Sequence, residues 1–179
     1  MRIIAGSHKG ARIFAPKGQD TRPTGDRARE AAFNLIGPVD GTTVLDLFAG
    51  SGAMGLEALS RGALSAVFVE SDREACRAIE RNLDKLRLTG ATILQRDAVQ
   101  ALAAEAAAGR RYDLVLVDPP YRMFSSLQSA LSRYLPAVLA EGGLVVVETD
   151  AKEEPELPTL AERTSRRYGS TRLTLYEQP

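Results

Sequence analysis

The sequence has few of the residues on which metal and nucleophile chemistry depends. Among 179 residues there is one cysteine, one histidine and no tryptophan. The single cysteine, Cys76, excludes an intrachain disulfide and any zinc site built from several cysteines, and we expect it only to pack in the interior. The single histidine, His8, excludes metal sites built on a histidine pair and weakens a Ser-His-Asp interpretation. We therefore expect no bound metal.

Long apolar runs are also missing. No run approaches the roughly 20 residues that a membrane-spanning helix needs, and the first residues do not resemble a signal peptide. The apolar fraction of 44% and the charged fraction of 26% are typical of a globular protein. The length is that of one domain. We expect a single cytoplasmic domain, a monomer, that makes no contact with a membrane.

An excess of either charge is absent as well, because basic and acidic side chains number 23 each. The two signs are nevertheless segregated. Residues 1–30 carry seven basic and three acidic side chains, whereas residues 141–162 carry seven acidic side chains and one lysine. A basic segment attracts phosphate, so the N-terminal residues are candidates for contacting nucleic acid. The acidic residues at 148–156 are expected to form a solvated loop that keeps RNA away from that edge.

Aliphatic strands alternate with helices from about residue 43 onward. The pattern predicts strands at 44–48, 66–70, 92–96, 112–117 and 143–148, and helices at 26–36, 52–61, 73–86, 98–108 and 124–139. This alternation indicates an α/β fold with a parallel sheet covered on both faces. Residues 166–168 and 171–177 predict an antiparallel hairpin at one edge, and residues 2–5 with 12–15 predict a short basic hairpin. Asp26 is expected to cap the first helix.

A glycine-rich turn follows the first strand. Residues 49–55 contain the G-x-G-x-x-G spacing, which lets backbone N–H groups approach a ligand at a helix N-terminus. Glu70 ends the next strand 20 residues after Gly50 and is placed to accept both ribose hydroxyls of an adenosine-type ligand. NAD-binding proteins share this pattern. Asp46 favours S-adenosylmethionine, because a carboxylate there would repel a pyrophosphate and can receive an ammonium group. Asp97 can accept from the adenine amine, cap the following helix, or do both.

A rigid polar turn, Asp118-Pro119-Pro120-Tyr121, follows the fourth strand. Ligands of open parallel sheets bind at the carboxyl ends of the strands, so this turn is expected to face the same site. The Asp118 carboxylate and the Pro119 carbonyl are two fixed acceptors that suit the two hydrogens of an exocyclic amine, and Tyr121 can stack on the base. The pattern therefore predicts methyl transfer to a base amine, with catalysis mostly by positioning.

The motifs together resemble a known family. Residues 44–55 with Asp118 to Tyr121 are similar to class I S-adenosylmethionine-dependent methyltransferases that act on amino groups of bases. Residues 2–6, 21–30 and 168–172 resemble the bacterial small-subunit rRNA guanine-N2 methyltransferases of the RsmD type, and the resemblance covers essentially the whole chain. It implies a Rossmann-like class I methyltransferase fold with a seven-stranded, mostly parallel sheet. Residues 1–25 would form an RNA-binding hairpin extension and residues 26–179 the catalytic core.

The resemblance also implies ligands and site residues. The cofactor would be S-adenosylmethionine, the product S-adenosylhomocysteine, and the partner one guanine of 16S rRNA within the 30S subunit or its assembly intermediate. The catalytic residues would be Asp118, Pro119, Pro120 and Tyr121. The cofactor would contact Asp46, Ala49, Gly50, Ser51, Gly52, Glu70, Ser71, Asp97, Ala98 and Asp118. The basic N-terminal segment would contact RNA through His8, Lys9, Arg12, Arg22, Thr24 and Arg27.

Several alternatives remain open at this point. His8 can instead be a solvated turn residue, and Arg22 and Arg27 can instead form ion pairs with Asp26 or Glu30. The same Asp-Pro-Pro-Tyr turn suits adenine N6 in DNA, although the chain is short for a separate target-recognition domain. An NAD-dependent oxidoreductase and a non-catalytic RNA-binding assembly factor are the other classes considered. Asp46 argues against the first, and the intact glycines and Asp118 argue against the second.

Overall fold

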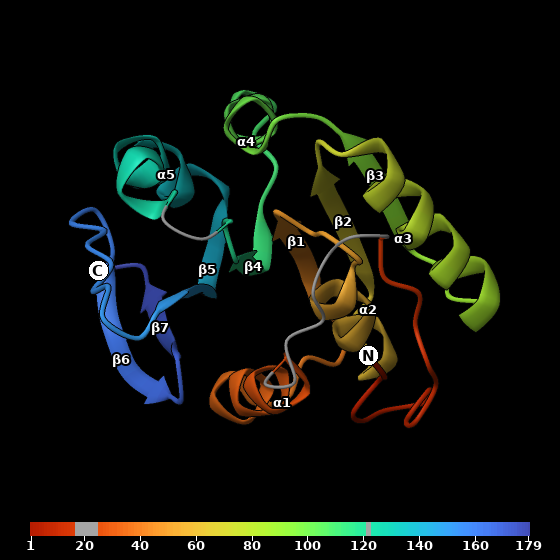
Figure 1. The fold of residues 1–179 in the computed structure, drawn as a ribbon. Helices are drawn as coiled ribbons and strands as arrows, with labels where there is room; N and C mark the ends of the chain where they lie inside the picture. The colour runs from red at the N-terminus through yellow and green to blue at the C-terminus, as the bar shows by residue number, and fades with distance from the viewer. Residues whose placement is uncertain (17–24, 121–122) are drawn as a thin grey trace.

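The computed structural model describes residues 1–16, 25–120 and 123–179, and its centre is one mixed sheet (Figure 1). The strands are β1 (Thr43–Leu47), β2 (Ser65–Glu70), β3 (Ala91–Gln95), β4 (Tyr112–Val117), β5 (Leu139–Asp150), β6 (Ala161–Tyr168) and β7 (Thr171–Glu177). Their order across the sheet is β3-β2-β1-β4-β5-β7-β6. β3, β2, β1, β4 and β5 pair in parallel, whereas β7 is antiparallel to both β5 and β6. The predicted mostly parallel, seven-stranded sheet with an antiparallel edge hairpin is confirmed.

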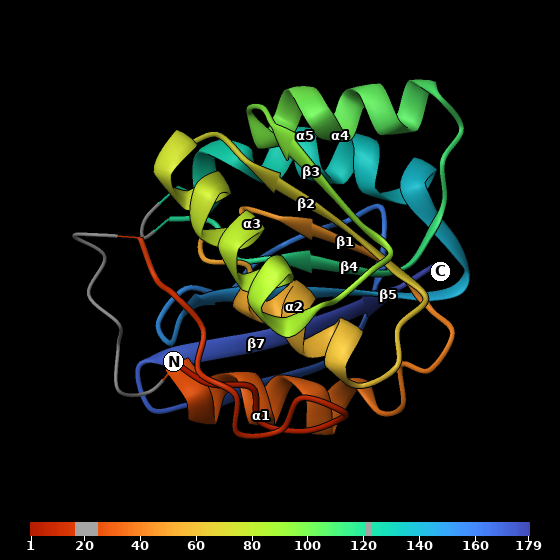
Figure 2. The ribbon, with the colours of Figure 1, turned by 90° about the vertical axis from the view of Figure 1, so that its right-hand side faces the viewer.

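Helices cover both faces of the sheet (Figure 2). The helices α1 (Gly25–Ile36), α2 (Ala53–Ser60) and α3 (Arg73–Leu86) lie on one face. The helices α4 (Ala98–Ala107) and α5 (Phe124–Val138) lie on the other. In Figure 2 the arrowheads of the five parallel strands point toward the same edge, so the loops that follow them gather there.

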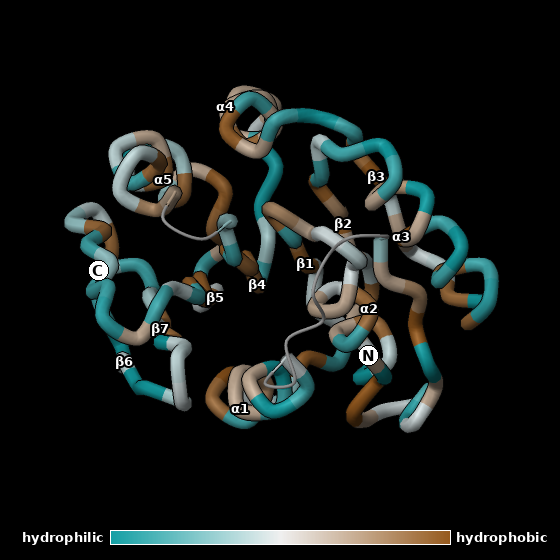
Figure 3. The backbone as a smooth tube through the Cα atoms, in the orientation of Figure 1, coloured by the Kyte–Doolittle hydropathy of each residue, from teal (hydrophilic) through white to brown (hydrophobic). Residues whose placement is uncertain are grey.

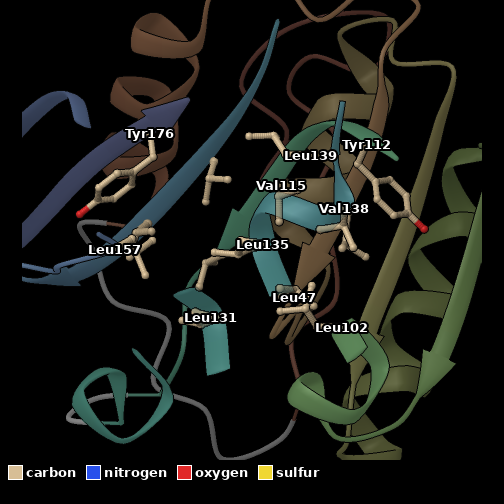
Figure 4. Packing of buried hydrophobic residues seen from close by; sticks show 14 of the residues in the cluster. Leu47, Leu102, Tyr112, Val115, Leu131, Leu135, Val138, Leu139, Leu157 and Tyr176 are labelled. Atoms are coloured by element: carbon tan, nitrogen blue, oxygen red, sulfur yellow. The ribbon is translucent and has the colours of Figure 1, made fainter. Parts of the chain in front are cut away.

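Two apolar cores lie on the two faces, because successive residues of a strand point to opposite sides. Leu45 and Leu47 of β1 pack with Leu102 beneath α4 and α5 (Figure 4). Val44 points the other way and packs with Leu56 beneath α2. All five side chains have no measurable exposure. Full burial of such a side chain stabilises the fold by about 1.5–3 kcal/mol, so the two cores hold the strand ends in a fixed arrangement.

Most element boundaries agree with the predicted ones to within two residues, and three differences bear on the structure. α1 begins at Gly25, so Asp26 lies in its first turn and does not cap it. There it accepts a hydrogen bond of 2.8 Å from the Arg29 guanidinium. β5 begins four residues before the predicted strand because Leu139 pairs with Tyr112 of β4 across a register shift. β6 is five residues longer than predicted at its N-terminal end, and it is hydrophilic along most of its length (Figure 3).

Residues 1–16, which we call the N-terminal arm, do not form the two predicted strands. Arg2 and Arg12 make a single antiparallel bridge. On either side of it, Ile3 N donates to Ala11 O at 2.9 Å and Ile13 N donates to Met1 O at 3.1 Å, and nearer the turn Gly10 N donates to Ile3 O at 2.8 Å. Three backbone hydrogen bonds between the two segments do not make a stable hairpin, so the position of the arm depends on the helices beneath it.

Buried polar side chains of α2 and α3 hold the N-terminal arm. Glu57 is fully buried, and its carboxylate accepts from Ile4 N at 2.9 Å and from Ala5 N at 3.1 Å. Asn82 is also fully buried, and its amide accepts from Phe14 N and donates to Phe14 O. At Gly6 the arm lies so close to α2 that a Cβ atom would sit 1.9 Å from the Ser60 carbonyl oxygen. These contacts tie the arm to the core along most of its length.

The acidic segment 148–156 is only in part the solvated loop that its charge predicts. Residues 148–150 belong to β5, and the loop after them is anchored to the sheet although Glu154 and Glu156 are exposed. Pro155 and the following Leu157 are buried, and the Pro155 carbonyl accepts a 2.6 Å hydrogen bond from the Tyr176 hydroxyl of β7. Glu154 forms an ion pair of 3.3 Å with Arg172. Apolar anchors therefore hold this segment against the sheet despite its charge.

Candidate functional site

A cavity of about 680 Å³ opens at the carboxyl ends of the parallel strands. We call it the strand-end cavity. Its walls come from the loops after β1, β2, β3 and β4, from the end of β5, and from parts of the N-terminal arm and α1. Ligand sites commonly have volumes of about 300–1,000 Å³ and lie at this edge of an open α/β sheet. The cavity therefore has the size and place of a ligand site.

The loop between β1 and α2 forms one wall and has an unusual backbone. Phe48 adopts φ +64°, a left-handed conformation that costs a non-glycine residue about 1–2 kcal/mol. Gly52 stands at the N-cap of α2 with φ +81°, where glycine pays no such cost. Ala53 and Met54 of the first turn of α2 line the cavity. The positive end of the helix dipole and its first N–H groups therefore face a ligand placed there.

Asp46 lies beneath this loop and is only 3% exposed. Its Oδ2 accepts a 3.0 Å hydrogen bond from Gly55 N, which joins β1 to the first turn of α2. Burial raises the pKa of Asp46 to about 7, although the Gly55 hydrogen bond opposes the shift and the Glu70 charge adds to it. A carboxyl group in such surroundings gains from a positively charged neighbour, since a cation would compensate the buried negative charge.

Glu70 at the end of β2 connects two loops of the cavity wall. One carboxylate oxygen accepts from Gly50 N at 2.7 Å, and the other accepts from Asp72 N at 2.9 Å. Each oxygen has further lone-pair capacity, so the predicted contact with ribose hydroxyls remains compatible with these bonds. Glu70 therefore holds the glycine loop in place in addition to any contact with a ligand.

Asp97 caps α4, as one of its two predicted roles requires. Its side chain accepts a 3.0 Å hydrogen bond from Gln100 N, and the side chain is otherwise exposed. It also lines the strand-end cavity. Its contact with an adenine amine remains a prediction.

Asp118 directly follows β4, and Glu148 lies two residues before the end of the neighbouring β5, on the opposite side of the cavity from Glu70. The register of β4 and β5 pairs Val117 with Val147, so the next residues, Asp118 and Glu148, stand side by side. Both line the cavity, as do Pro119 and Pro120. Hydrogen-bond acceptors therefore gather where the sequence places a base amine.

The predicted RNA contacts lie elsewhere. Lys9, Arg12 and Arg27 are exposed and do not line the strand-end cavity. His8 is half-buried, with Nε2 2.7 Å from the Leu86 carbonyl at the end of α3 and Nδ1 2.8 Å from the Ser7 hydroxyl. The His8 ring therefore fixes the arm to α3. Its predicted phosphate contact would have to form without displacing these bonds.

Most of the predicted cofactor and catalytic residues meet in the cavity. Those that line it are Asp46, Ala49, Gly50, Ser51, Glu70, Ser71, Asp97, Ala98, Asp118, Pro119 and Pro120. Gly52 does not line the cavity; it is the N-cap residue of α2. Arg22, Thr24 and Tyr121 lie outside the described residues. Within the described ranges, no group of three or more histidine, cysteine, aspartate or glutamate residues has a geometry that could hold a metal ion.

Sequence reasoning missed some residues of the cavity wall. Arg29 of α1 lines it with a guanidinium that is 4% exposed, bonded to Asp26 and to the Arg2 carbonyl, and within 4.0 Å of Glu57. Only a prediction of how α1 packs would have found it. Glu148 could have been found, because it ends the predicted strand 143–148 as Glu70 ends the predicted strand 66–70.

A profile of the protein family described as "Conserved hypothetical protein 95" matches residues 1–177. The chain belongs to this family. It is 40% identical over 186 residues to the Bacillus subtilis (strain 168) protein YlbH, with 99% of each chain covered. It is 37% identical over 161 residues to the Escherichia coli (strain K12) protein named Ribosomal RNA small subunit methyltransferase D, with 89% of this chain and 79% of that protein covered.

The fold is shared with solved members of the same group. The structure of yhhF from Escherichia coli matches with a TM-score of 0.84 at 32% identity, covering 99% of this chain and 97% of that one. The family resemblance and the Rossmann-like fold predicted from the motifs are thus confirmed. Within the described part of the chain, no helix is long and apolar enough to cross a membrane.

Proposed function

We propose that this protein transfers a methyl group from S-adenosylmethionine to the exocyclic N2 amine of one guanine in 16S rRNA. The observation that carries the proposal is the shared cavity: the glycine loop with Asp46 and Glu70 forms one side, and Asp118 with Pro119 forms the other. A donor of nucleoside type and a base amine would meet between them. The name of the Escherichia coli relative, a small-subunit rRNA methyltransferase, supports the rRNA substrate.

The residues of the cavity fit S-adenosylmethionine better than a dinucleotide. Asp46 is a buried carboxyl group whose raised pKa marks an uncompensated site for negative charge. An ammonium group would compensate it, whereas a pyrophosphate would add repulsion. Asp46 would receive the amino group, the glycine loop would receive the carboxylate, and Glu70 would receive the ribose hydroxyls. When bound, the cofactor supplies the methyl group and leaves as S-adenosylhomocysteine.

The proposed reaction requires the protein mainly to position the base amine. The Asp118 carboxylate and the Pro119 carbonyl would accept its two hydrogens, and the two prolines keep these acceptors at a fixed separation. Both hydrogens are then engaged in the plane of the base, so the nitrogen lone pair is directed out of that plane toward the methyl group. The amine becomes acidic once methylated and loses a proton. Positioning of this kind can supply about 7–11 kcal/mol of the barrier reduction.

The proposed function also implies how the RNA is bound and in which form it is the substrate. The exposed basic side chains of the N-terminal arm and α1 would contact phosphates, while the target base enters the strand-end cavity. The 30S subunit or its assembly intermediate is the expected form of the substrate, because a few basic residues alone give weak binding to bare RNA.

Labelled S-adenosylmethionine and 30S particles from cells that lack the enzyme test the proposal. Label should appear on RNA, and mapping should place it on the N2 amine of one guanine. Label on DNA adenine with none on RNA would refute it and favour the adenine-N6 alternative. The variant Asp118→Ala should lose transfer and keep cofactor binding. Asp84→Ala, the same change on an exposed face of α3, is the matched control and should keep both.

A further inference from the structure

Neither the proposed cofactor contacts nor the amine contacts use Glu148, Asp150 or Glu153 of the strand-end cavity, and of these three Glu148 lies beside Asp118. It lies in β5 beside Asp118, which directly follows β4, since the paired residues immediately before them are Val117 and Val147. Neighbouring strands lie about 4.8 Å apart, so the two carboxylates start from backbones one strand spacing apart. Both also border the same small apolar recess beside Met54. Their side chains therefore lie on the same face of the sheet.

The partly buried position of Glu148 favours a ligand that donates hydrogen bonds. The Glu148 side chain is half-buried, whereas Asp118 is exposed. Leu173 of β7 pairs with Glu148 and has no measurable exposure, so the carboxylate has an apolar neighbour on its outer side. A carboxylate with reduced access to water gains most from N–H donors and is repelled by acceptor atoms.

Guanine and adenine differ in this respect at the position next to the amine. In guanine the neighbour of the N2 amine is N1–H, a donor, so the amine and N1–H form a continuous donor edge. In adenine the neighbour of the N6 amine is N1 with a lone pair, an acceptor. An amine held by Asp118 would bring this neighbouring atom toward the adjacent residue of β5, which is Glu148.

We propose that Glu148 selects guanine by accepting its N1–H while Asp118 and Pro119 hold the N2 amine. This inference rests on the proposed function and names the residue that decides its base specificity. Asp118 alone would hold the amine of either purine. The carboxylate of Glu148 would make the adenine edge unfavourable, because it would face the N1 lone pair. Glu148 is then a specificity residue beside the reacting amine.

The test compares two bases in one RNA. Reconstituted 30S particles carry guanosine or 2-aminopurine riboside at the mapped position. The second base keeps the amine, but its N1 is an acceptor. Wild-type protein should methylate guanosine at least about 100-fold better in kcat/KM, because a site built for a hydrogen bond can reject an analogue lacking it by up to about 10⁴–10⁵-fold. Glu148→Gln offers an amide N–H to N1 of 2-aminopurine, so the ratio should fall below about 10-fold.

Matched measurements separate the explanations. Glu141→Gln, the same change at the other, exposed end of β5, should keep the wild-type ratio. Cofactor binding by Glu148→Gln, measured by calorimetry, checks that the variant is folded and should equal that of the wild type. If Glu148→Gln keeps the wild-type ratio of kcat/KM for guanosine over 2-aminopurine, the inference is overturned. Loss of methyl transfer to both bases also overturns it, because Glu148 would then be needed for the reaction and not for base selection. Failure of the wild type to label guanosine would instead overturn the proposed function.

Discussion

Replacing Asp46 by asparagine separates the cost of burying a carboxyl group from its use in binding a ligand. The side chain is 3% exposed and holds Gly55 N through one oxygen. Asparagine has nearly the same shape, and its carbonyl oxygen can accept the same hydrogen bond. The variant therefore changes the charge at this position and little else.

The magnitude follows from the pKa of Asp46, which burial raises from 3.8 to about 7. Between these values the folded protein keeps a proton on Asp46 that the unfolded chain has released, so the free energy of unfolding falls as pH rises. One pKa unit corresponds to about 1.4 kcal/mol, which gives about 4 kcal/mol over the whole range. About 3 kcal/mol of this is lost between about pH 5 and about pH 8, because the fall is complete above the folded pKa.

Asparagine does not titrate, so the free energy of unfolding of Asp46→Asn does not fall in this way. Relative to the wild type, it should rise by about 3 kcal/mol when the pH is raised from about 5 to about 8. Urea unfolding of both ligand-free proteins at the two pH values measures this difference. Asp84→Asn, at an exposed position, should run parallel to the wild type. S-adenosylmethionine should bind more weakly to Asp46→Asn. A constant difference in unfolding free energy between wild type and Asp46→Asn across this pH range would refute the argument from burial.

Three further predictions concern the N-terminal arm. Gly6→Ala should lower the free energy of unfolding by at least about 2 kcal/mol, because its Cβ would overlap the Ser60 carbonyl. Gly10→Ala is the control, because Gly10 has a similar φ but open space around it, and it should lower the free energy of unfolding by about 1 kcal/mol in the same urea titration. Asn82→Ala leaves the backbone of Phe14 and the Ser51 carbonyl without their buried partner and should cost about 3 kcal/mol by thermal or urea unfolding. Binding to bare RNA should weaken steeply with salt in a filter-binding titration, and tight binding that ignores salt would contradict the phosphate contacts proposed for the arm.

The inner strands could be predicted from the sequence because a strand that is buried on both faces consists of consecutive aliphatic residues. Leu114 to Val117 of β4 are an example, and each of them is buried. β6 carries no such pattern. It pairs with β7 alone and is exposed over much of its length, so its residues Ala161 to Arg166 show no periodicity from which the extra length could be read.

The candidate site could be predicted where it depends on strand ends and could not where it depends on packing between distant segments. Asp46, Glu70 and Asp118 stand at or next to the ends of strands, which the sequence marks clearly. The place of Arg29 in the cavity wall depends on how α1 packs beside α2. The contact of Glu57 with Ile4 joins residues 53 positions apart, and no local sequence pattern predicts such a pair.

The anchoring of the N-terminal arm has a consequence for the order in which the protein folds as it is made. Residues 1–16 are synthesised before their binding partners Glu57, Ser60, Asn82 and the Leu86 carbonyl. On a translating ribosome the arm can dock only after α3 has emerged and packed. At about 5–20 residues per second, this leaves the basic segment undocked for several seconds beside the ribosomal surface. The N-terminal arm thus cannot reach its native place until the chain has been made at least as far as Leu86.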